Sequence, residues 1–405
     1  MHRVIFKNTL YQTLAKIITS GIGFILIVLI ARAFGVSIYG QFAQITAFVT
    51  LFYLLIDFGF NAIFLQQEDG KFLDLIALRF YWTLSTFFIV LAVSFLFPYN
   101  PLSQSGFSPL VKLGIVIFSF SLFAQSFTVS ATALFQKNQR FDYLWISQAT
   151  GSLATLFLVI LAIASNASLL YVMGAYVVGN FITAAVALFF TKERIFKPTL
   201  RVSVWKKLVK QAWPLGLMLV FNLIYFRVDI LLLSALKSSH DVGVYSLAYQ
   251  FFDFLLALPL FLSNSLYPVL LEKQHASGFS KLIRQYFIVF LLFSFFCMTL
   301  FWFFAPLFTF IRPEFAATIV PFRILLISLP FFFTTSFLQW IIITAKKQRY
   351  LLGVYFFSML FNIILNIVFI PQFGYIASAV ITGVSEAIVF VFLFAKVIHV
   401  QLHYE

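Results

Sequence analysis

The 405-residue sequence carries very little charge for its length. Asp, Glu, Lys and Arg make up 10% of the residues, against about a quarter in soluble domains, whereas 62% of the residues are hydrophobic. The mean hydropathy is +1.02. A water-soluble protein of this composition would expose large apolar patches to water. The composition therefore excludes a soluble globular protein and indicates a chain whose outer faces contact lipid.

Cysteine is also scarce, and the sequence lacks the motifs of several kinds of chemistry. The single cysteine, Cys297, lies in an apolar run and cannot form an intramolecular disulfide. No G-x-x-x-x-G-K-[ST] sequence is present, which excludes a P-loop that handles ATP, and the zinc motif H-E-x-x-H is absent as well. We therefore predict no cofactor and no metal site, apart from a coupling ion (H⁺ or Na⁺), and we expect that the protein is not an enzyme.

Long apolar runs take up most of the chain. A helix needs about 20 apolar residues to cross the hydrocarbon core of a bilayer. Runs such as IGFILIVLI are apolar on every face, unlike the alternating strands of a membrane barrel. We interpret the basic N-terminus and the run after it as a retained first helix rather than a cleaved signal peptide. The predicted spans are 13–34, 41–65, 80–98, 110–135, 143–165, 168–190, 212–236, 242–268, 286–311, 318–344, 351–371 and 374–396.

The basic residues lie mostly in alternate loops. Twenty-one of the 27 Lys and Arg residues fall on one side of the predicted spans, most densely in the segment 191–211. The positive-inside rule makes this side cytoplasmic, with both termini inside. The net charge of +14 is then a signal of topology, and no nucleic-acid partner is expected because no basic face stands clear of the membrane. Within that segment, VWKKLVKQAW predicts a short basic helix at the membrane interface.

Two short matches relate the halves of the chain. VSIYGQFAQ at 36–44 and VGVYSLAYQ at 242–250 share V-x-[IV]-Y-x4-Q at an offset of 206. KNQRF at 137–141 and KKQRY at 346–350 share K-x-Q-R-[FY] at an offset of 209. Each pair occupies the same place within a set of six predicted spans, which indicates an internal repeat.

The repeat predicts the domain organisation. Because six is an even number, both halves enter the membrane in the same sense, which gives parallel repeats related by an axis along the membrane normal. We therefore expect an all-α polytopic membrane protein. Its 12 transmembrane helices would form two parallel six-helix bundles, 1–198 and 199–405, around a central cavity that opens alternately to each side.

Polar side chains recur at helical spacing within the predicted spans. A charge at the bilayer centre costs at least about 2.5–3.5 kcal/mol on insertion scales, so it normally faces the protein interior. Residues three or four apart share one helix face, and such stripes would line an aqueous cavity. The alternative is that these groups only satisfy one another as structural hydrogen bonds between helices.

The kind of side chain indicates what the cavity would hold. Cationic groups indicate an anionic substrate, most simply one that carries phosphate, whereas acidic groups are candidates for coupling to H⁺ or Na⁺. Lys16 and Arg32 could instead extend to the headgroups, and Asp57 and Asp253 could lie at headgroup depth. The predicted substrate-binding residues are Lys16, Arg32, Arg227 and Arg323. The predicted coupling-ion or cavity residues are Asp57, Asn61, Asn222, Asp229, Asp253, Asn362, Asn366, Thr382 and Glu386.

Several segments resemble one family of transporters. ARAFGVSIYGQFA, LLIDFGFNAIF, ALFQKNQRFDY, RVDILLLSAL and LFNIILNIVFIPQFGYIASAVITGVSE resemble the polysaccharide flippases, the O-antigen flippase (Wzx) branch of the MOP (MATE/MviN-like) superfamily. The segments come from both halves, so the resemblance spans nearly the whole chain. It implies two six-helix bundles in a V shape around a cationic lumen. It also implies a substrate that is an oligosaccharide on undecaprenyl pyrophosphate, flipped from the cytoplasmic to the periplasmic leaflet.

The resemblance further implies a place in the cell and a set of partners. It implies a monomer in the bacterial cytoplasmic (inner) membrane that serves O-antigen, lipopolysaccharide or similar polysaccharide biosynthesis, beside a polysaccharide polymerase and a chain-length regulator. Some relatives carry a Na⁺ site between helices seven, eleven and twelve. Asp229, Asn366 and Thr382 lie on the corresponding helices here, although the site is not matched residue by residue. The chain lacks the two extra helices of the lipid II flippase branch, which favours the twelve-helix branch.

Two other functions are alternatives to flipping. A multidrug or organic cation exporter of the same superfamily would need an acidic lumen, and the arginines within the spans argue against it. A membrane-embedded O-antigen polymerase or ligase would carry a large periplasmic loop, whereas every loop predicted outside is short. We therefore expect ion-coupled flipping of a lipid-linked oligosaccharide by alternating access.

Overall fold

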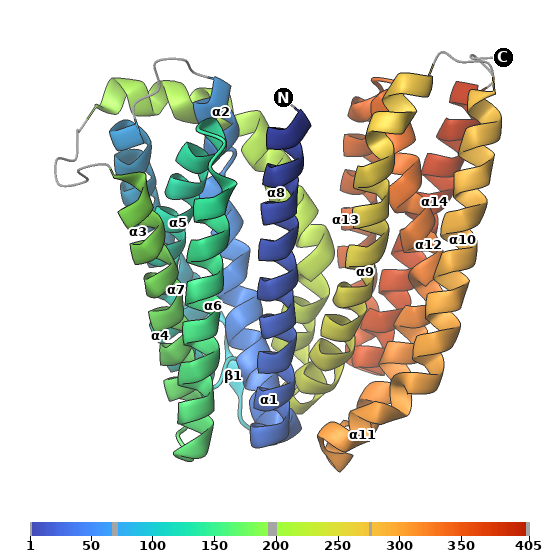
Figure 1. Ribbon diagram of the computed structural model, residues 1–405. Coiled ribbons are helices and arrows are strands. Elements are labelled where there is room, and N and C mark those ends of the chain that lie inside the picture. The colour runs from blue at the N-terminus through green and yellow to red at the C-terminus, as the bar shows by residue number, and fades with distance from the viewer. Residues whose placement is uncertain (1, 67–71, 193–200, 275–277, 402–405) are drawn as a thin grey trace. The chain divides into compact units, whose positions relative to one another are not determined.

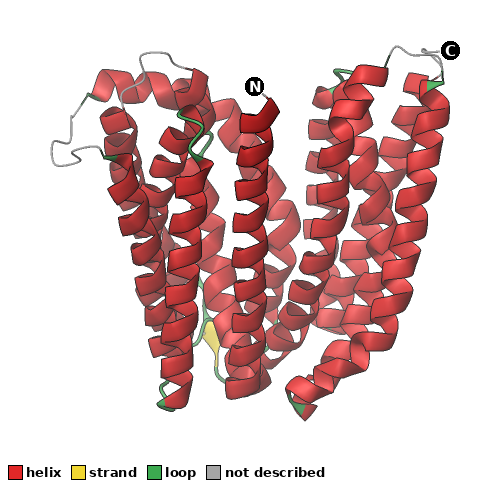
Figure 2. Cartoon of the chain, viewed as in Figure 1, coloured by secondary structure: helices red, strands yellow, loops and turns green. Residues whose placement is uncertain are grey.

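The computed structural model describes residues 2–66, 72–192, 201–274 and 278–401, and nearly all of them are helical (Figures 1 and 2). Helices dominate because a segment in lipid must satisfy its backbone hydrogen bonds internally. Among the described residues, the only strands are Tyr99–Asn100 (β1) and Ser105–Gly106 (β2), which form an antiparallel pair. The predicted all-α fold class is confirmed.

By packing, the chain forms two compact units, Met1–Leu223 (unit 1) and Ile224–Glu405 (unit 2). The predicted bundles, 1–198 and 199–405, are defined by the number of spans rather than by packing. Their boundary therefore stays a prediction.

Unit 1 begins with a helix that contains two membrane passes, α1 (His2–Asp57). Gly35 has φ 77° and ψ 176°, a region that is essentially restricted to glycine, so the chain can break direction there. A second break follows the end of α1, where Phe58 and Gly59 have φ 41° and 77°. The helices that follow are α2 (Phe60–Gln66), α3 (Phe72–Leu96), α4 (Pro109–Ser119), α5 (Ser121–Lys137), α6 (Phe141–Ala164), α7 (Leu169–Thr191) and the first part of α8 (Val202–Leu236).

The first turns of α8 lie across the end of unit 1 (Figure 1). Arg201, which precedes the helix, has its Nη1 3.7 Å from Oδ2 of Asp74 at the start of α3. Leu208 and Ala212 are buried in a hydrophobic cluster with Phe58, which lies between α1 and α2, and with residues of α2, α3 and α5. The segment VWKKLVKQAW thus forms the first turns of a 35-residue helix, and both a salt bridge and apolar burial attach it to unit 1.

Unit 2 is organised around α12 (Ile319–Thr344), which packs against α9, α10 and α14 and has most of its residues buried. Its Phe-rich sequence suits this central place, because aromatic side chains bury a large apolar area. The other elements are the second part of α8, α9 (Ser239–Lys273), α10 (Phe279–Phe304), the 3₁₀ turns η1 (Ala305–Leu307) and η2 (Pro313–Thr318), α11 (Phe308–Ile311), α13 (Gln348–Phe373) and α14 (Tyr375–Gln401).

The number of membrane passes agrees with the prediction. Among the described residues, 10 helical segments are long and apolar enough to cross a membrane. One of them, Ile18–Gln66, holds the two passes that Gly35 separates. The long helix α8 is not among the 10, and it covers the predicted span 212–236. Together these segments account for the predicted twelve spans.

The K-x-Q-R-[FY] sequences lie at corresponding junctions, between α5 and α6 and between α12 and α13. Each junction contains a left-handed residue, Gln139 with φ 53° and Lys346 with φ 58°. In each, the next residue donates its N–H to the carbonyl five positions before the donor, at 2.8 and 3.0 Å. The turn falls two residues earlier within the second motif, so the repeat preserves the place of the junction but not the register of its turn.

Candidate functional site

A buried carboxylate on α8 is held to two other helices of unit 2. Asp229 is 3% exposed. It accepts a hydrogen bond from the hydroxyl of Tyr245 on α9, and the Thr382 hydroxyl on α14 lies 3.5 Å from its Oδ2. The backbone N–H of Ile230 donates to Oδ1 at 2.7 Å. Within the described part of the chain no cation lies within ion-pair distance of this carboxylate.

A second buried carboxylate lies on α14, one helical turn after Thr382. Glu386 is 3% exposed, and it accepts hydrogen bonds from Tyr225 of α8 at 2.9 Å and from Thr335 of α12. Tyr225 comes four residues before Asp229, and Glu386 comes four residues after Thr382. Helices α8 and α14 are therefore joined by two polar bridges one turn apart, each with one carboxylate and neutral hydroxyl partners.

Amide and hydroxyl oxygens on α13 and α14 add to this polar region. Asn366 donates from Nδ2 to the backbone oxygen and Oδ1 of Asn362, both at 2.9 Å. Asn362 in turn donates to Ser385 at 3.1 Å. Oδ1 of Asn366 and Oγ of Ser378 are buried and have no hydrogen-bond partner among the described residues. Such oxygens remain available to a ligand that accepts lone pairs, because a buried polar atom left unpaired costs free energy.

The structure pairs one predicted substrate-binding cation with a predicted acidic residue. Nη2 of Arg227 lies 2.9 Å from Oδ2 of Asp253, and the side chains are 30% and 27% exposed. The guanidinium carbon also lies 5.7 Å from the ring centroid of Tyr249. Arg227 thus has a neutralising partner and remains partly accessible.

In unit 1, Asp57 and Asn61 are held by an arginine that lies outside the predicted span 80–98. Arg79 is fully buried. It donates to Asp57 at 3.3 Å, Asn61 at 2.9 Å, Ser130 at 2.9 Å and the backbone oxygen of Ile56 at 3.1 Å. Hydropathy begins the span at residue 80, but α3 begins at Phe72, so Arg79 lies inside the helix. Arg79 must therefore be removed from the basic residues that were counted in the predicted cytoplasmic loops.

The other predicted residues are not brought together by the contacts that the structure describes. Lys16 and Arg32 are exposed on α1. Arg323 lies 5.0 Å from the ring centroid of Trp302, and its Nη2 is 3.5 Å from the Trp302 carbonyl oxygen. The side chain of Asn222 lies outside the described residues. Lys16 and Arg32 belong to unit 1 and the two arginines to unit 2, so their meeting in one lumen stays a prediction.

Two hydroxyl partners of the carboxylates, Tyr245 and Thr335, are not among the predicted site residues. Tyr245 is the tyrosine of the repeat sequence VGVYSLAYQ, so a signal for it existed. Thr335 lies in the run FFFTTSF without a polar stripe around it, so nothing in the sequence distinguished it.

The donor set indicates which ligands would fit. The described residues contain no group of three or more His, Cys, Asp or Glu side chains that could hold a metal ion. A carboxylate surrounded by hydroxyl and amide oxygens is instead a hard-oxygen environment, which suits a proton or a small hard cation rather than a transition metal.

Solved transporter structures resemble this fold. The lipid II flippase MurJ in an inward closed conformation has a TM-score of 0.77 at 17% identity, covering 96% of this chain and 87% of that one. An inward-facing multidrug resistance MATE family transporter of the MOP superfamily has a TM-score of 0.65 at 14% identity, with 97% and 95% covered. The eukaryotic MATE transporter AtDTX14 has 0.62 at 12%, with 98% and 96% covered. The fold is that of the MOP superfamily of membrane transporters.

The sequence comparisons place the chain more closely. The family model described as "Polysaccharide biosynthesis protein" matches residues 5–274, and the model MatE matches residues 214–368. No curated protein sequence matches the chain. Because the first match covers more than half of the sequence, the chain belongs to the polysaccharide biosynthesis protein family.

Proposed function

We propose that the protein is a flippase for an oligosaccharide linked to undecaprenyl pyrophosphate, an O-antigen or similar surface polysaccharide repeat unit. It would act as a monomer in the bacterial inner membrane, with both termini cytoplasmic, and would supply a polymerase and its chain-length regulator. Membership of the polysaccharide biosynthesis protein family supports a carbohydrate-bearing substrate. The transporter fold supports translocation rather than bond chemistry.

The buried Asp229 carboxylate is the observation that carries ion coupling. Removing an ionised carboxylate from water costs several kcal/mol unless a positive charge compensates it, and the hydroxyls of Tyr245 and Thr382 supply none. A bound Na⁺ or a proton would neutralise the charge. The unpaired oxygens of Asn366 and Ser378 are of the type that binds Na⁺, so we assign Na⁺ as the coupling ion and Asp229 as its charged ligand.

Ion binding would be coupled to transport because the Na⁺-loaded site and the empty site favour different conformations. A ligand shifts a conformational equilibrium only by its differential affinity for the two states. Na⁺ would favour the conformation in which the bridges between α8, α9 and α14 are formed, whereas an empty, charged Asp229 would favour one that admits water. The sodium gradient would thereby give the alternation of access a direction.

The cations have a separate role in this proposal. Arg227 would exchange its partner Asp253 for the pyrophosphate of the substrate, because both are oxyanions that a guanidinium binds through charged hydrogen bonds. Lys16, Arg32 and Arg323 would contact the pyrophosphate or acidic sugars.

A reconstitution assay tests the proposal. Full-length protein in liposomes is given a fluorescent undecaprenyl-pyrophosphate-linked oligosaccharide, and translocation is measured as the fraction protected from an external sugar-modifying reagent. We expect the initial rate of translocation to change at least several-fold when a Na⁺ gradient is imposed in either direction. Asp229→Asn should abolish this response because it removes the charge that the ion neutralises.

Asp142→Asn is the matched control, because Asp142 is partly exposed and paired with Arg140. It should keep the sodium response. Translocation equal to that of protein-free liposomes would refute the flippase function. Flipping with an unchanged sodium response in Asp229→Asn would refute only the ion assignment.

A multidrug exporter is the second candidate, and the match of the MatE model to residues 214–368 favours it. Under this alternative, a deletion strain would become sensitive to organic cations and would keep its surface polysaccharide. Altered polysaccharide chain length with normal flipping would instead indicate a polymerase.

A further inference from the structure

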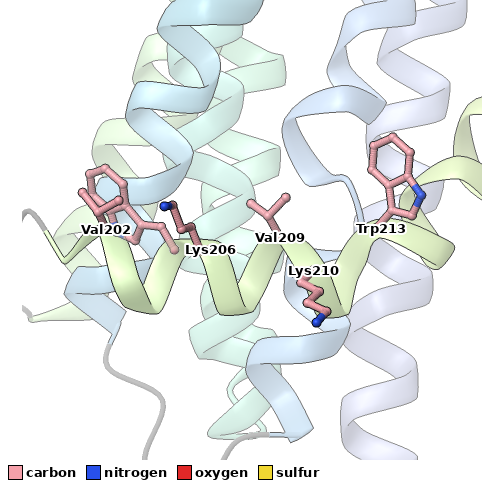
Figure 3. Close-up of a pocket in the computed structure, with 6 residues that line it drawn as sticks. Val202, Lys206, Val209, Lys210 and Trp213 are labelled. Atoms are coloured by element: carbon pink, nitrogen blue, oxygen red, sulfur yellow. The ribbon is translucent and has the colours of Figure 1, made fainter.

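The first turns of α8 carry a groove that the transport proposal does not use (Figure 3). It has a volume of about 480 Å³. The apolar lining residues are spaced three or four apart, so they form one stripe along the helix. The groove is lined by Val202, Trp205, Lys206, Val209, Lys210 and Trp213.

The packing of the helix leaves the two ends of this groove open. Leu208 and Ala212 are buried in the hydrophobic cluster of unit 1, and Trp205 and Val209 are partly buried and pack against it. Val202 and Trp213, at the two ends of the groove, are both 53% exposed. Figure 3 shows the helix running across its neighbours instead of alongside them. Because helices of unit 1 are long and apolar enough to span a membrane, we expect a helix that crosses their ends to lie along the membrane surface, where tryptophan is enriched.

The charge on the groove has no partner within the described part of the protein. Lys206 and Lys210 are exposed and one helical turn apart, and no described acidic side chain lies within ion-pair distance of either. Arg201, at the start of the same segment, is paired with Asp74. Figure 3 shows the two side chains extending from opposite edges of the helix, so the apolar stripe has an ammonium group on either side, a charge that an amphiphilic anion would complement.

We propose that this groove binds an anionic phospholipid of the bilayer. The phosphate lies between Lys206 and Lys210, and an acyl chain packs on Val209 and Trp213. Membrane lipid is the occupant because the groove opens at the membrane surface and combines an apolar floor with cationic rims. The bound lipid would anchor the start of α8 to the surface, independently of the substrate that is flipped.

Energy transfer from tryptophan to a dansyl-labelled phosphatidylglycerol tests the proposal. Full-length protein is placed in phosphatidylcholine nanodiscs, and the labelled lipid is titrated into them. The Lys206→Gln/Lys210→Gln variant should weaken binding about 10- to 30-fold, from the attraction expected for two basic residues at an anionic surface. The affinity of the unaltered protein should fall as salt is raised.

Lys207→Gln is the matched control, because Lys207 is exposed on the same turn but does not line the groove. It should change the affinity less than 2-fold, and all variants should elute as the unaltered protein does in size-exclusion chromatography. An equal loss in Lys207→Gln would indicate unspecific attraction and overturn the proposal. Equal affinity for dansyl-labelled phosphatidylcholine would overturn it too. Displacement of the bound lipid by equimolar undecaprenyl pyrophosphate would assign the groove to the substrate instead.

Discussion

Arg79 and Asp229 are both charged groups with almost no access to water, yet their surroundings differ in kind. Arg79 has a carboxylate, Asp57, 3.3 Å away and three neutral acceptors besides. Asp229 has only neutral donors among the described residues. A charge with a fixed partner stabilises one structure, whereas a charge without one depends on an exchangeable ligand. This difference is our reason for proposing Asp229, and not Arg79, as a coupling residue.

Arg79→Gln should destabilise the protein because it leaves the Asp57 carboxylate without its cation. Breaking a fully buried pair costs about 3–5 kcal/mol. Asp57 keeps 29% of its side chain exposed, so we expect a smaller loss, about 2–3 kcal/mol. Thermal unfolding of the purified protein in detergent would measure it as a lower melting temperature.

Two further variants test whether the stability is lost because a buried charge has no partner. Adding Asp57→Asn to Arg79→Gln should recover part of the stability, because the unpaired charge is then gone. Arg140→Gln breaks a shorter ion pair, 2.7 Å to Asp142, whose members are 48% and 30% exposed, and it should lower the melting temperature only slightly. Equal losses in Arg79→Gln and Arg140→Gln would contradict the role assigned to burial.

At the scale of elements, the crossing of α6 and α7 depends on two glycines that face each other. A Cβ at Gly151 would lie 2.9 Å from the carbonyl oxygen of Gly179, and a Cβ at Gly179 would lie 3.2 Å from that of Gly151. Thr155 and Thr183 each donate to the carbonyl of the glycine four residues earlier on their own helix, at 2.9 and 3.1 Å. Small residues permit such close helix packing in membranes.

Gly179→Ala should therefore destabilise unit 1. The added methyl would lie 2.9 Å from Cβ of Thr155, so one of the two helices must shift, and overpacking of this kind costs about 1–3 kcal/mol. The control is Gly174→Ala on the same helix, where a Cβ meets nothing within 4 Å. That control should preserve or raise the melting temperature, since alanine favours helix. A lower melting temperature in both variants alike would mean that α7 needs glycine for its backbone and not for the crossing.

How far these elements could be predicted depended on the kind of signal. Apolar length located the passes, and helical spacing placed Asp229, Thr382 and Glu386 on inward faces, because both are local properties of the chain. The Arg227–Asp253 pair joins α8 to α9, and no local pattern encodes such a pair. Arg79 was misplaced because hydropathy cannot tell a charge that ends a helix from one that is buried with a partner.

At the scale of the whole molecule, the two predicted halves differ in their carboxylates. Subtracting the offset of the nearer match, 206 for Asp229 and 209 for Glu386, gives Gly23 and Val177. The first half therefore has no carboxylate at the positions where unit 2 has its two buried ones. If the halves are the parallel repeats that we predict, this confines the proposed coupling to unit 2, whereas cations of both units are proposed to contact the substrate.

The orientation of the molecule in the membrane is a prediction from its basic loops, and cysteine labelling can test it. Cys297 is buried, 3% exposed, so Cys297→Ala yields a cysteine-free background with a single change. Two exposed serines then serve as probes in unit 1: Ser103, in the turn of the β1–β2 hairpin, and Ser203, in the first turn of α8. Figure 1 shows the hairpin and the start of α8 at opposite ends of this unit.

We expect a membrane-impermeant maleimide to label Ser103→Cys in cells with a permeabilised outer membrane and an intact inner membrane, and to leave Ser203→Cys unlabelled. Ser203→Cys should become reactive only once the inner membrane is opened, because the basic segment around it is predicted to be retained in the cytoplasm. The denatured proteins, both fully reactive, supply the reference for each probe. The reverse pattern would invert the topology, and the groove on α8 would then face the outer leaflet. That result would also reverse the side from which the flippase takes its substrate, since parallel repeats turn over together.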